Sequence, residues 1–183
     1  MPSARNFAVN FALSKKIRID YISFCDSDDW WNKDWLYCLI KNSNNYDLVF
    51  SDGFEYKKTG KKEVICSYEQ IELIKRCSVY LQSMLLSKEF LKKILKKDKK
   101  IFNENFDISY DYDFLIRNKK HIKYFHVKKK LFNYNKLSNS ISSKNLFKII
   151  IQWEMIRKSN NIKNFILFHK KSLARLIQFV IPY

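Results

Sequence analysis

The stretch FCDSDDWW, from Phe24 to Trp31, decides how this 183-residue chain is interpreted. It places three carboxylates, Asp26, Asp28 and Asp29, within four positions of a protein whose formal net charge is +17. Two carboxylates about 5 Å apart repel each other by roughly 3 kcal/mol at an effective dielectric constant near 20. The cluster is therefore either fully solvated or neutralised by a bound cation.

The residues before the cluster favour a bound cation. Arg18 to Cys25 reads RIDYISFC, an apolar run that is typical of a buried strand in a parallel sheet. Ligands bind outside the carboxyl ends of the strands in open α/β sheets, and in an extended segment Asp26 and Asp28 project to the same side. Hard oxygen ligands of this kind suit Mg²⁺ or Mn²⁺. The alternative is an Asx-rich turn that leads into the next helix, because Asp and Ser are ordinary turn and N-cap residues.

Four separated segments of the chain carry short motifs, and the order of these motifs is informative. They read PSARNFAVNFAL at 2–13, DSDD at 26–29, SYDYDFLIR at 109–117 and LFNYNKLSNSIS at 131–142. In this order they resemble the Ala-Arg-Asn segment, the Asp-Ser-Asp-Asp motif, the Glu-Asp segment and the closing Ser-x-Ser stretch of family 2 glycosyltransferases, which have the GT-A fold. No single motif is specific, but the order supports the resemblance over residues 2–142.

The resemblance implies an α/β fold class. We expect a partial GT-A (Rossmann-like) mixed sheet with flanking helices, incomplete at its N-terminus, in residues 1–142, and a basic amphipathic helical tail in residues 143–183. It also implies an enzyme that moves a sugar from a nucleotide-sugar donor to a glycan or lipid-linked acceptor. Surface polysaccharide or lipopolysaccharide synthesis is the implied process, and inversion at the anomeric carbon the implied stereochemistry.

The same resemblance assigns roles to six side chains. Asp28, with Asp26 or Asp29, would hold Mn²⁺ or Mg²⁺ on the donor diphosphate and stabilise the leaving group. Arg5 and Asn6 would lie at the donor site. Asp111 would take the proton from the acceptor hydroxyl. The predicted donor-binding residues are thus Arg5, Asn6, Asp26 and Asp28, the predicted metal ligands are Asp26, Asp28 and Asp29, and the predicted catalytic base is Asp111.

Two departures from the family pattern bear on these roles. The family normally begins with two strands and their turns, which hold the base and ribose and need on the order of 60 to 100 residues. Here Met1 lies one residue before the segment that should follow them, so the sequence predicts a catalytic part without its nucleotide-binding half. Tyr110 stands where the family usually has Glu, so only Asp111 is left for the base role.

Each assignment has a structural alternative. Asp111 and Asp113 near a helix start are also ordinary acids favoured by the helix dipole. Arg5 could be a solvated charge, although its fork of donors suits a phosphate. Trp30 and Trp31 could wall a sugar site, but packing against the sheet is the more common role of such residues.

Composition excludes several other classes of protein. A hydrophobic content of 46% and an aromatic content of 16% fit one domain with a real core. With two glycines, neither a Walker loop nor a GxGxxG turn can form. The four cysteines show no CxxC pair, which predicts reduced, structural thiols in a cytoplasmic protein. No signal region and no run of about 18 apolar residues is present.

The pattern of apolar residues and turn signals predicts the order of helices and strands. Helices are expected at 4–14, 33–41, 69–76 and 88–96, with Ser87 as N-cap of the last, and a further helix capped by Ser109. Strands are expected at 21–25, 47–50 and 124–133, with a hairpin reaching 64–66 and an extended core segment at 78–86.

The tail leaves two alternatives open. Apolar residues at helical spacing lie beside Lys170, Lys171 and Arg175, so the segment 162–183 would either contact an anionic membrane surface or dock on the catalytic part. The first alternative would make the protein peripheral on the inner face of the cytoplasmic membrane.

Two other functions compete with the transferase. A basic protein that binds anionic lipid or nucleic acid would explain the net charge of +17, although the acidic cluster repels phosphate and makes nucleic acid the weaker partner. A non-catalytic remnant of a transferase would explain the missing N-terminal half.

Overall fold

The computed structural model describes residues 2–14, 18–137 and 145–162. Its elements follow one another as α1 (Pro2–Ser14), β1 (Tyr21–Ser23), β2 (Trp30–Trp31), α2 (Trp35–Lys41), β3 (Leu48–Lys57), β4 (Gly60–Val64), α3 (Gln70–Lys75), the 3₁₀ turn η1 (Leu81–Ser83), β5 (Met84–Ser87), α4 (Lys88–Asp98), α5 (Tyr110–Asn118), β6 (Tyr124–Asn135) and α7 (Leu146–Ser159). The predicted helices at 4–14, 33–41, 69–76 and 88–96 and the helix after Ser109 are confirmed, with boundaries that differ by a few residues. Two strands differ from the prediction: β2 was not expected, and β3 continues to Lys57 where the predicted strand ended at residue 50.

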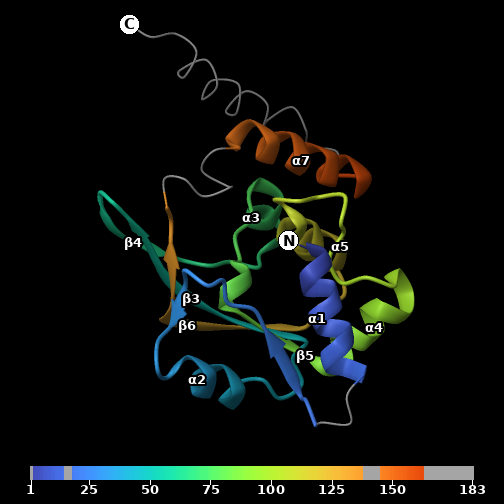
Figure 1. Ribbon diagram of the computed structural model, residues 1–183, viewed down its shortest axis with the longest axis horizontal. Helices are drawn as coiled ribbons and strands as arrows, with labels where there is room; N and C mark the ends of the chain where they lie inside the picture. The colour runs from blue at the N-terminus through green and yellow to red at the C-terminus, as the bar shows by residue number, and fades with distance from the viewer. Residues whose placement is uncertain (1, 15–17, 138–144, 163–183) are drawn as a thin grey trace, which may run out of the picture.

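A mixed sheet forms the centre of the described part of the chain. Its strand order is β1-β5-β3-β6-β2, and β4 pairs with β3 outside this path. The long strands β3 and β6 run parallel to each other, whereas the other pairs are antiparallel. Figure 1 shows α2 on one side of this sheet and α5, with α7 beyond it, on the other. The predicted α/β class, a mixed sheet with flanking helices, is therefore confirmed.

The strand β1 corrects one prediction. It is an edge strand that pairs antiparallel with β5, Tyr21 opposite Ser87, and its residues are only half-buried. The expected buried strand of a parallel sheet is therefore wrong. The apolar content of a segment predicts a strand, but it does not specify which neighbour pairs with it or in which direction.

The residues after β1 correct a second prediction. Asp26 to Asp29 form a turn, in which the Asp29 N–H donates to the Asp26 carbonyl at 3.0 Å. Asp26 and Asp28 therefore do not share one side of an extended segment. The turn alternative describes this backbone correctly, although the turn leads into β2 and not directly into a helix.

A glycine allows β3 and β6 to pack closely where their register shifts. A Cβ atom on Gly53 would lie 2.5 Å from the Phe132 ring and 2.5 Å from the Phe132 carbonyl oxygen. The register between the two strands shifts at Ser51, Asp52 and Gly53. Phe132 itself is fully buried, so the missing side chain of Gly53 makes room for a core aromatic ring.

The helix α7 packs on the rest of the described structure. Ile156 and Arg157 are buried, and Arg157 Nε donates to the Ile74 carbonyl at 2.9 Å and to the Tyr112 hydroxyl at 3.2 Å. All but one residue of the predicted segment 162–183 lies outside the described residues, so its membrane contact and the boundary at 142/143 stay predictions. Among the described helices, none has the length and apolar character needed to cross a bilayer.

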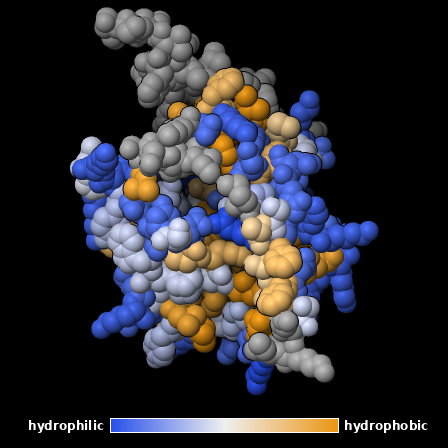
Figure 2. Space-filling view, in the orientation of Figure 1, coloured by the Kyte–Doolittle hydropathy of each residue, from blue (hydrophilic) through white to orange (hydrophobic). Residues whose placement is uncertain are grey.

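The outer face of α1 carries exposed apolar side chains. Phe7 is 72% exposed and Phe11 52%, and their rings stack with centroids 6.2 Å apart. Figure 2 shows hydrophobic residues gathered over α1 on this face of the molecule. The opposite face of the helix packs against the rest of the protein through Asn6 and Val9, which are buried.

Candidate functional site

The acidic turn, Asp26 to Asp29, lies between β1 and β2 and gives its three carboxylates different surroundings. Asp26 forms an ion pair with Arg5. Asp28 is exposed and has no hydrogen bond or ion pair to any described residue. Asp29 Oδ1 accepts the Asn135 N–H at 2.8 Å, whereas its Oδ2 is buried without a partner among the described residues. The turn thus exposes the free carboxylate of Asp28 and leaves one buried oxygen of Asp29 without a partner among the described residues.

The surroundings of Asp29 also change its protonation. Burial, above all, raises the pKa of Asp29 to about 6, and the nearby charges of Asp28 and Asp26 add to the rise, while the Asn135 N–H opposes it. A cation bound at the turn would replace this mutual repulsion by attraction and keep the three groups ionised.

Arg5, on α1, connects the turn to α5. Its side chain is only 14% exposed and pairs with Asp26, and its guanidinium lies 5.0 Å from the centroid of the Tyr110 ring. Burial raises the pKa of Asp111, and the charge of Arg5 opposes this rise. The nitrogen Nη1 is buried without a partner among the described residues, so one face of the guanidinium is still able to donate.

Asp111 lies in the first turn of α5 and is half-buried. Its Oδ1 accepts the Tyr112 N–H at 2.8 Å, and its Oδ2 lies 3.7 Å from the Cys77 sulfur. Burial raises the pKa of Asp111, and the Tyr112 N–H, Arg5 and the Cys77 thiol oppose the rise. The charge of Arg5 thus acts both on the acidic turn and on the half-buried carboxylate of Asp111.

Of three other candidate residues, Asn6 and Trp31 are held by contacts within the protein, whereas Trp30 is exposed. Asn6 does not face the turn: its amide donates to the Phe102 carbonyl at 2.8 Å and accepts the Phe102 N–H at 2.9 Å. Trp31 stacks on Trp35 with ring centroids 4.1 Å apart. Trp30 is 44% exposed, so of the two tryptophans it is the one that a ligand can reach.

Asp113, the other acid in the first turn of α5, has a different environment. Asp113 is buried and pairs with Arg117, whose Nε lies 2.7 Å from its Oδ2. Arg117 also pairs with Asp98 at 2.8 Å. This network fixes α5 against α4, so Asp113 supports the position of Asp111.

The acidic turn fits a divalent cation only if the ligand set is completed from outside the described residues. No group of three or more His, Cys, Asp or Glu side chains in 2–14, 18–137 and 145–162 is placed to hold a metal ion. Mg²⁺ is usually bound by one or two carboxylates together with substrate phosphates and water, not by an all-protein cage. Asp28 is one exposed carboxylate of this kind, and the unpartnered, buried Oδ2 of Asp29 is the candidate for a second ligand.

Two contacts at the site had no signal in the sequence. Asn135 and Asp29 are 106 residues apart, and Cys77 and Asp111 are 34 residues apart. The four cysteines, all within the described residues, are free thiols. Reduced thiols were expected, but nothing in the local sequence distinguished Cys77 from the others.

Comparison with known proteins gives one family and one fold. The sequence profile described as Glycosyl transferase family 2 matches residues 1–125. The crystal structure of S. aureus TarS 1-349 is similar with a TM-score of 0.58 and 13% identity, over 92% of this chain and 50% of that chain. The crystal structure of S. aureus TarS is similar with a TM-score of 0.56 and 14% identity, over 91% and 30%.

At these identities the likeness to TarS shows the shared fold alone. The present chain spans half or less of the length of the TarS structures that it matches. No curated protein gives a significant match.

Proposed function

The chain belongs to glycosyl transferase family 2, and from this premise we propose that it transfers a sugar from a nucleotide-sugar donor to a hydroxyl group of a glycan acceptor. The position of Arg5 carries the proposal, because its charge is shared by Asp26 of the acidic turn and by Asp111. Sugar transfer needs positive charge at the leaving diphosphate, which Arg5 and a metal ion on the acidic turn would supply, and an anionic base at the acceptor hydroxyl.

On the donor side, Arg5 and the acidic turn receive the diphosphate. The unpartnered Nη1 of Arg5 is a buried cationic donor, and charge-assisted hydrogen bonds to phosphate oxygens are among the strongest in proteins. Asp28 and Asp29 Oδ2 would hold Mn²⁺ or Mg²⁺, which supplies Lewis-acid stabilisation of the leaving group when it is bound. The ion pair with Asp26 keeps Arg5 oriented toward the turn.

On the acceptor side, Asp111 removes the proton. Burial raises the pKa of its carboxyl group, which makes the carboxylate a stronger base, while the charge of the nearby Arg5 opposes this rise. Its Oδ1 is held by the Tyr112 N–H, so the carboxylate has a fixed direction. A base on the face opposite the leaving diphosphate gives inversion at the anomeric carbon.

We also propose a lipid-linked or surface glycan as the acceptor, and a cytoplasmic location close to the membrane. The formal net charge of +17 supports this, because an anionic leaflet attracts basic segments at about 1 kcal/mol per Lys or Arg near its surface. Exposed apolar residues of α7, including Phe147, Ile151 and Met155, lie on the same helix as Lys148 and Lys158.

The donor site is tested by thermal melting with Mn²⁺ and a panel of nucleoside diphosphates. At about 100 times the dissociation constant, binding adds roughly 2.7 kcal/mol, which shifts the melting temperature of a domain of this size by about 5 to 10 °C. We expect Asp28→Asn to lose the shift, and Asp20→Asn, an exposed carboxylate paired with Arg18, to keep it. Binding that falls steeply with salt and ignores Mn²⁺ would favour the anionic-lipid or nucleic-acid alternative.

The base is tested separately by Asp111→Asn. This variant should keep the Mn²⁺-dependent shift, because Asp111 does not touch the acidic turn, but its release of nucleoside diphosphate from a nucleotide sugar should fall by about 10² to 10⁴. Full turnover in this variant sinks the base role. No turnover of any donor by the wild-type chain, in a protein that melts cooperatively, favours the non-catalytic remnant.

A further inference from the structure

The contact between Cys77 and Asp111 has no counterpart among the other cysteines. The Cys77 sulfur lies 3.7 Å from Asp111 Oδ2 and 3.6 Å from the Val79 carbonyl oxygen. Both neighbours are acceptors, so the thiol can donate to only one of them at a time. Since the other oxygen of Asp111 already accepts the Tyr112 N–H, the thiol is the side-chain donor beside Oδ2.

We infer that Cys77 is a positioning residue for Asp111: its thiol donates to Oδ2 and fixes the direction in which the carboxylate faces the acceptor hydroxyl. This inference rests on the proposed function. An S–H group is a weak donor, so it restrains the carboxylate while withdrawing less of its charge than a hydroxyl would. A base held in this way keeps its basicity, whereas a strong donor would lower it.

The surroundings of the thiol keep it protonated. Burial raises the pKa of Cys77 well above its ordinary value, and the charge of Asp111 raises it further. The groups that face the pair are Arg5, Cys66, Tyr80 and Tyr112. Burial raises the pKa of Cys66 and of Tyr112 to about 12 and that of Tyr80 still higher.

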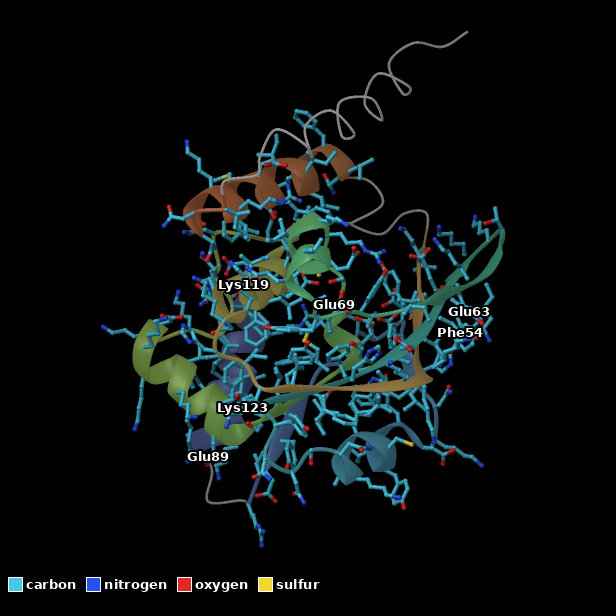
Figure 3. All side chains as sticks on the ribbon, turned by 180° about the vertical axis from the view of Figure 1, so that it is seen from behind. Phe54, Glu63, Glu69, Glu89, Lys119 and Lys123 are labelled. Atoms are coloured by element: carbon cyan, nitrogen blue, oxygen red, sulfur yellow. The ribbon has the colours of Figure 1, made fainter. Side chains whose placement is uncertain are left out.

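Cys77 can also be reached by a small reagent. It lines a pocket of about 240 Å³ between the β3–β4 hairpin and the segment 76–80, together with Glu55, Arg76 and Tyr80. Figure 3 shows Glu63, a further lining residue, on the hairpin at the end of the sheet. The pocket gives an assay of the contact that does not depend on turnover.

The first arm measures alkylation of Cys77 by iodoacetamide, followed by peptide mass spectrometry at one alkaline pH. In Asp111→Asn the charge that opposes the thiolate is gone, so we expect Cys77 to react about threefold faster or more than in the wild type, because the thiolate is the reactive form. Cys38 and the buried Cys66 serve as internal references, since local unfolding would accelerate Cys66 as well. Equal rates at Cys77 in the two proteins overturn the inference, whether or not the chain is active.

The second arm compares Cys77→Ala and Cys77→Ser with Cys38→Ala, using nucleoside diphosphate release at saturating Mn²⁺. Loss of the donor in Cys77→Ala should lower kcat about tenfold, leave KM for the nucleotide sugar unchanged, and move the acid limb of the pH profile to higher pH. Cys77→Ser restores a donor, so it should recover most of kcat and return the limb toward or below its wild-type position. Cys38→Ala should behave as the wild type.

Three results would count against the inference in this arm. Wild-type kcat and an unmoved acid limb in Cys77→Ala overturn it, as do equal losses in the two variants accompanied by a raised KM. A wild-type chain that turns over no donor sinks the proposed function and the positioning role with it, while the alkylation rates still report whether the thiol contacts Asp111.

Discussion

At the scale of the residue, the carboxyl group of Asp29 shows how the fold alters the chemistry of a side chain. Its pKa rises to about 6, chiefly through burial, whereas in an unfolded chain it is about 3.8 to 3.9. The folded state therefore prefers the protonated form. The contribution of this group to stability is fully present below the unfolded pKa and is lost as the pH rises through about 6.

The raised pKa of Asp29 predicts how the variant Asp29→Asn changes stability with pH. The amide resembles the protonated acid and its oxygen can still accept the Asn135 N–H, so without metal the variant should match the wild type near pH 4 and exceed it at pH 7.5. After allowance for solvent screening, we expect a gain of about 1 kcal/mol. Urea unfolding with a chelator present, at pH 4, 6 and 7.5, measures the difference. A variant less stable than the wild type at pH 7.5 would show that Oδ2 is not buried without a partner.

At the scale of the element, two serines at helix starts form a matched pair. Both Ser87 and Ser109 precede helices and were predicted as N-caps. The Ser87 hydroxyl accepts the Phe90 N–H at 3.3 Å, which confirms the cap of α4. The Ser109 hydroxyl makes no such bond and is buried without a partner among the described residues, because the Tyr112 N–H that it would accept donates to Asp111 Oδ1 instead.

The two alanine variants should therefore change the free energy of unfolding differently. Ser87→Ala should lower the free energy of unfolding by about 0.5 to 1 kcal/mol, the usual cost of a lost N-cap. Ser109→Ala removes a buried hydroxyl that has no partner, so it should be neutral or slightly stabilising. Urea midpoints of the two variants make the comparison. Equal losses would mean that Ser109 caps α5 in solution.

The pairing of β3 with β6 depends on one glycine. A methyl group on Gly53 would lie 2.5 Å from both the ring and the carbonyl oxygen of Phe132, and the carbonyl belongs to backbone that cannot rotate away. Gly53→Ala should therefore destabilise the protein by about 3 kcal/mol or more, measured by thermal melting. Gly53→Ala combined with Phe132→Leu should recover little, because the clash with the backbone remains. Complete rescue by the double variant would locate the clash in the ring alone.

At the scale of the whole molecule, α7 joins distant parts of the chain through one buried cation. Arg157 is 3% exposed, pairs with Glu154 and donates to the Ile74 carbonyl at 2.9 Å and the Lys75 carbonyl at 3.3 Å. These contacts cross from α7 to the end of α3, more than 80 residues earlier. Helix α5, which contains Asp111, is joined to the same cation through the Tyr112 hydroxyl.

Removing this cation should loosen the whole described structure. Arg157→Met leaves Glu154 half-buried and unpaired, so we expect a loss of about 3 kcal/mol in urea unfolding. Lys158→Met, at the next position and exposed, is the control and should change stability by less than about 0.5 kcal/mol. A loss below 1 kcal/mol in Arg157→Met would mean that α7 contributes little to folding.

The sequence by itself determined the local features of this protein. Apolar periodicity and turn residues predicted the helices and most of the strands, because helix and strand formation depend on neighbours within a few residues. The short strand β2 and the length of β3 were not predicted, since both depend on pairing with β6. The same reading placed the acidic turn after a strand, Asp111 in the first turn of a helix and the cap at Ser87. Motif order was enough to indicate family 2.

Tertiary structure decided the rest. It set β1 as an antiparallel edge strand, turned Asn6 away from the acidic turn, and brought Cys77 to Asp111 and Asn135 to Asp29. These contacts join residues from 34 to 106 positions apart. No local pattern encodes such pairs, because they follow from how the sheet and helices pack against one another, and burial in that packing also sets the pKa of each carboxyl group.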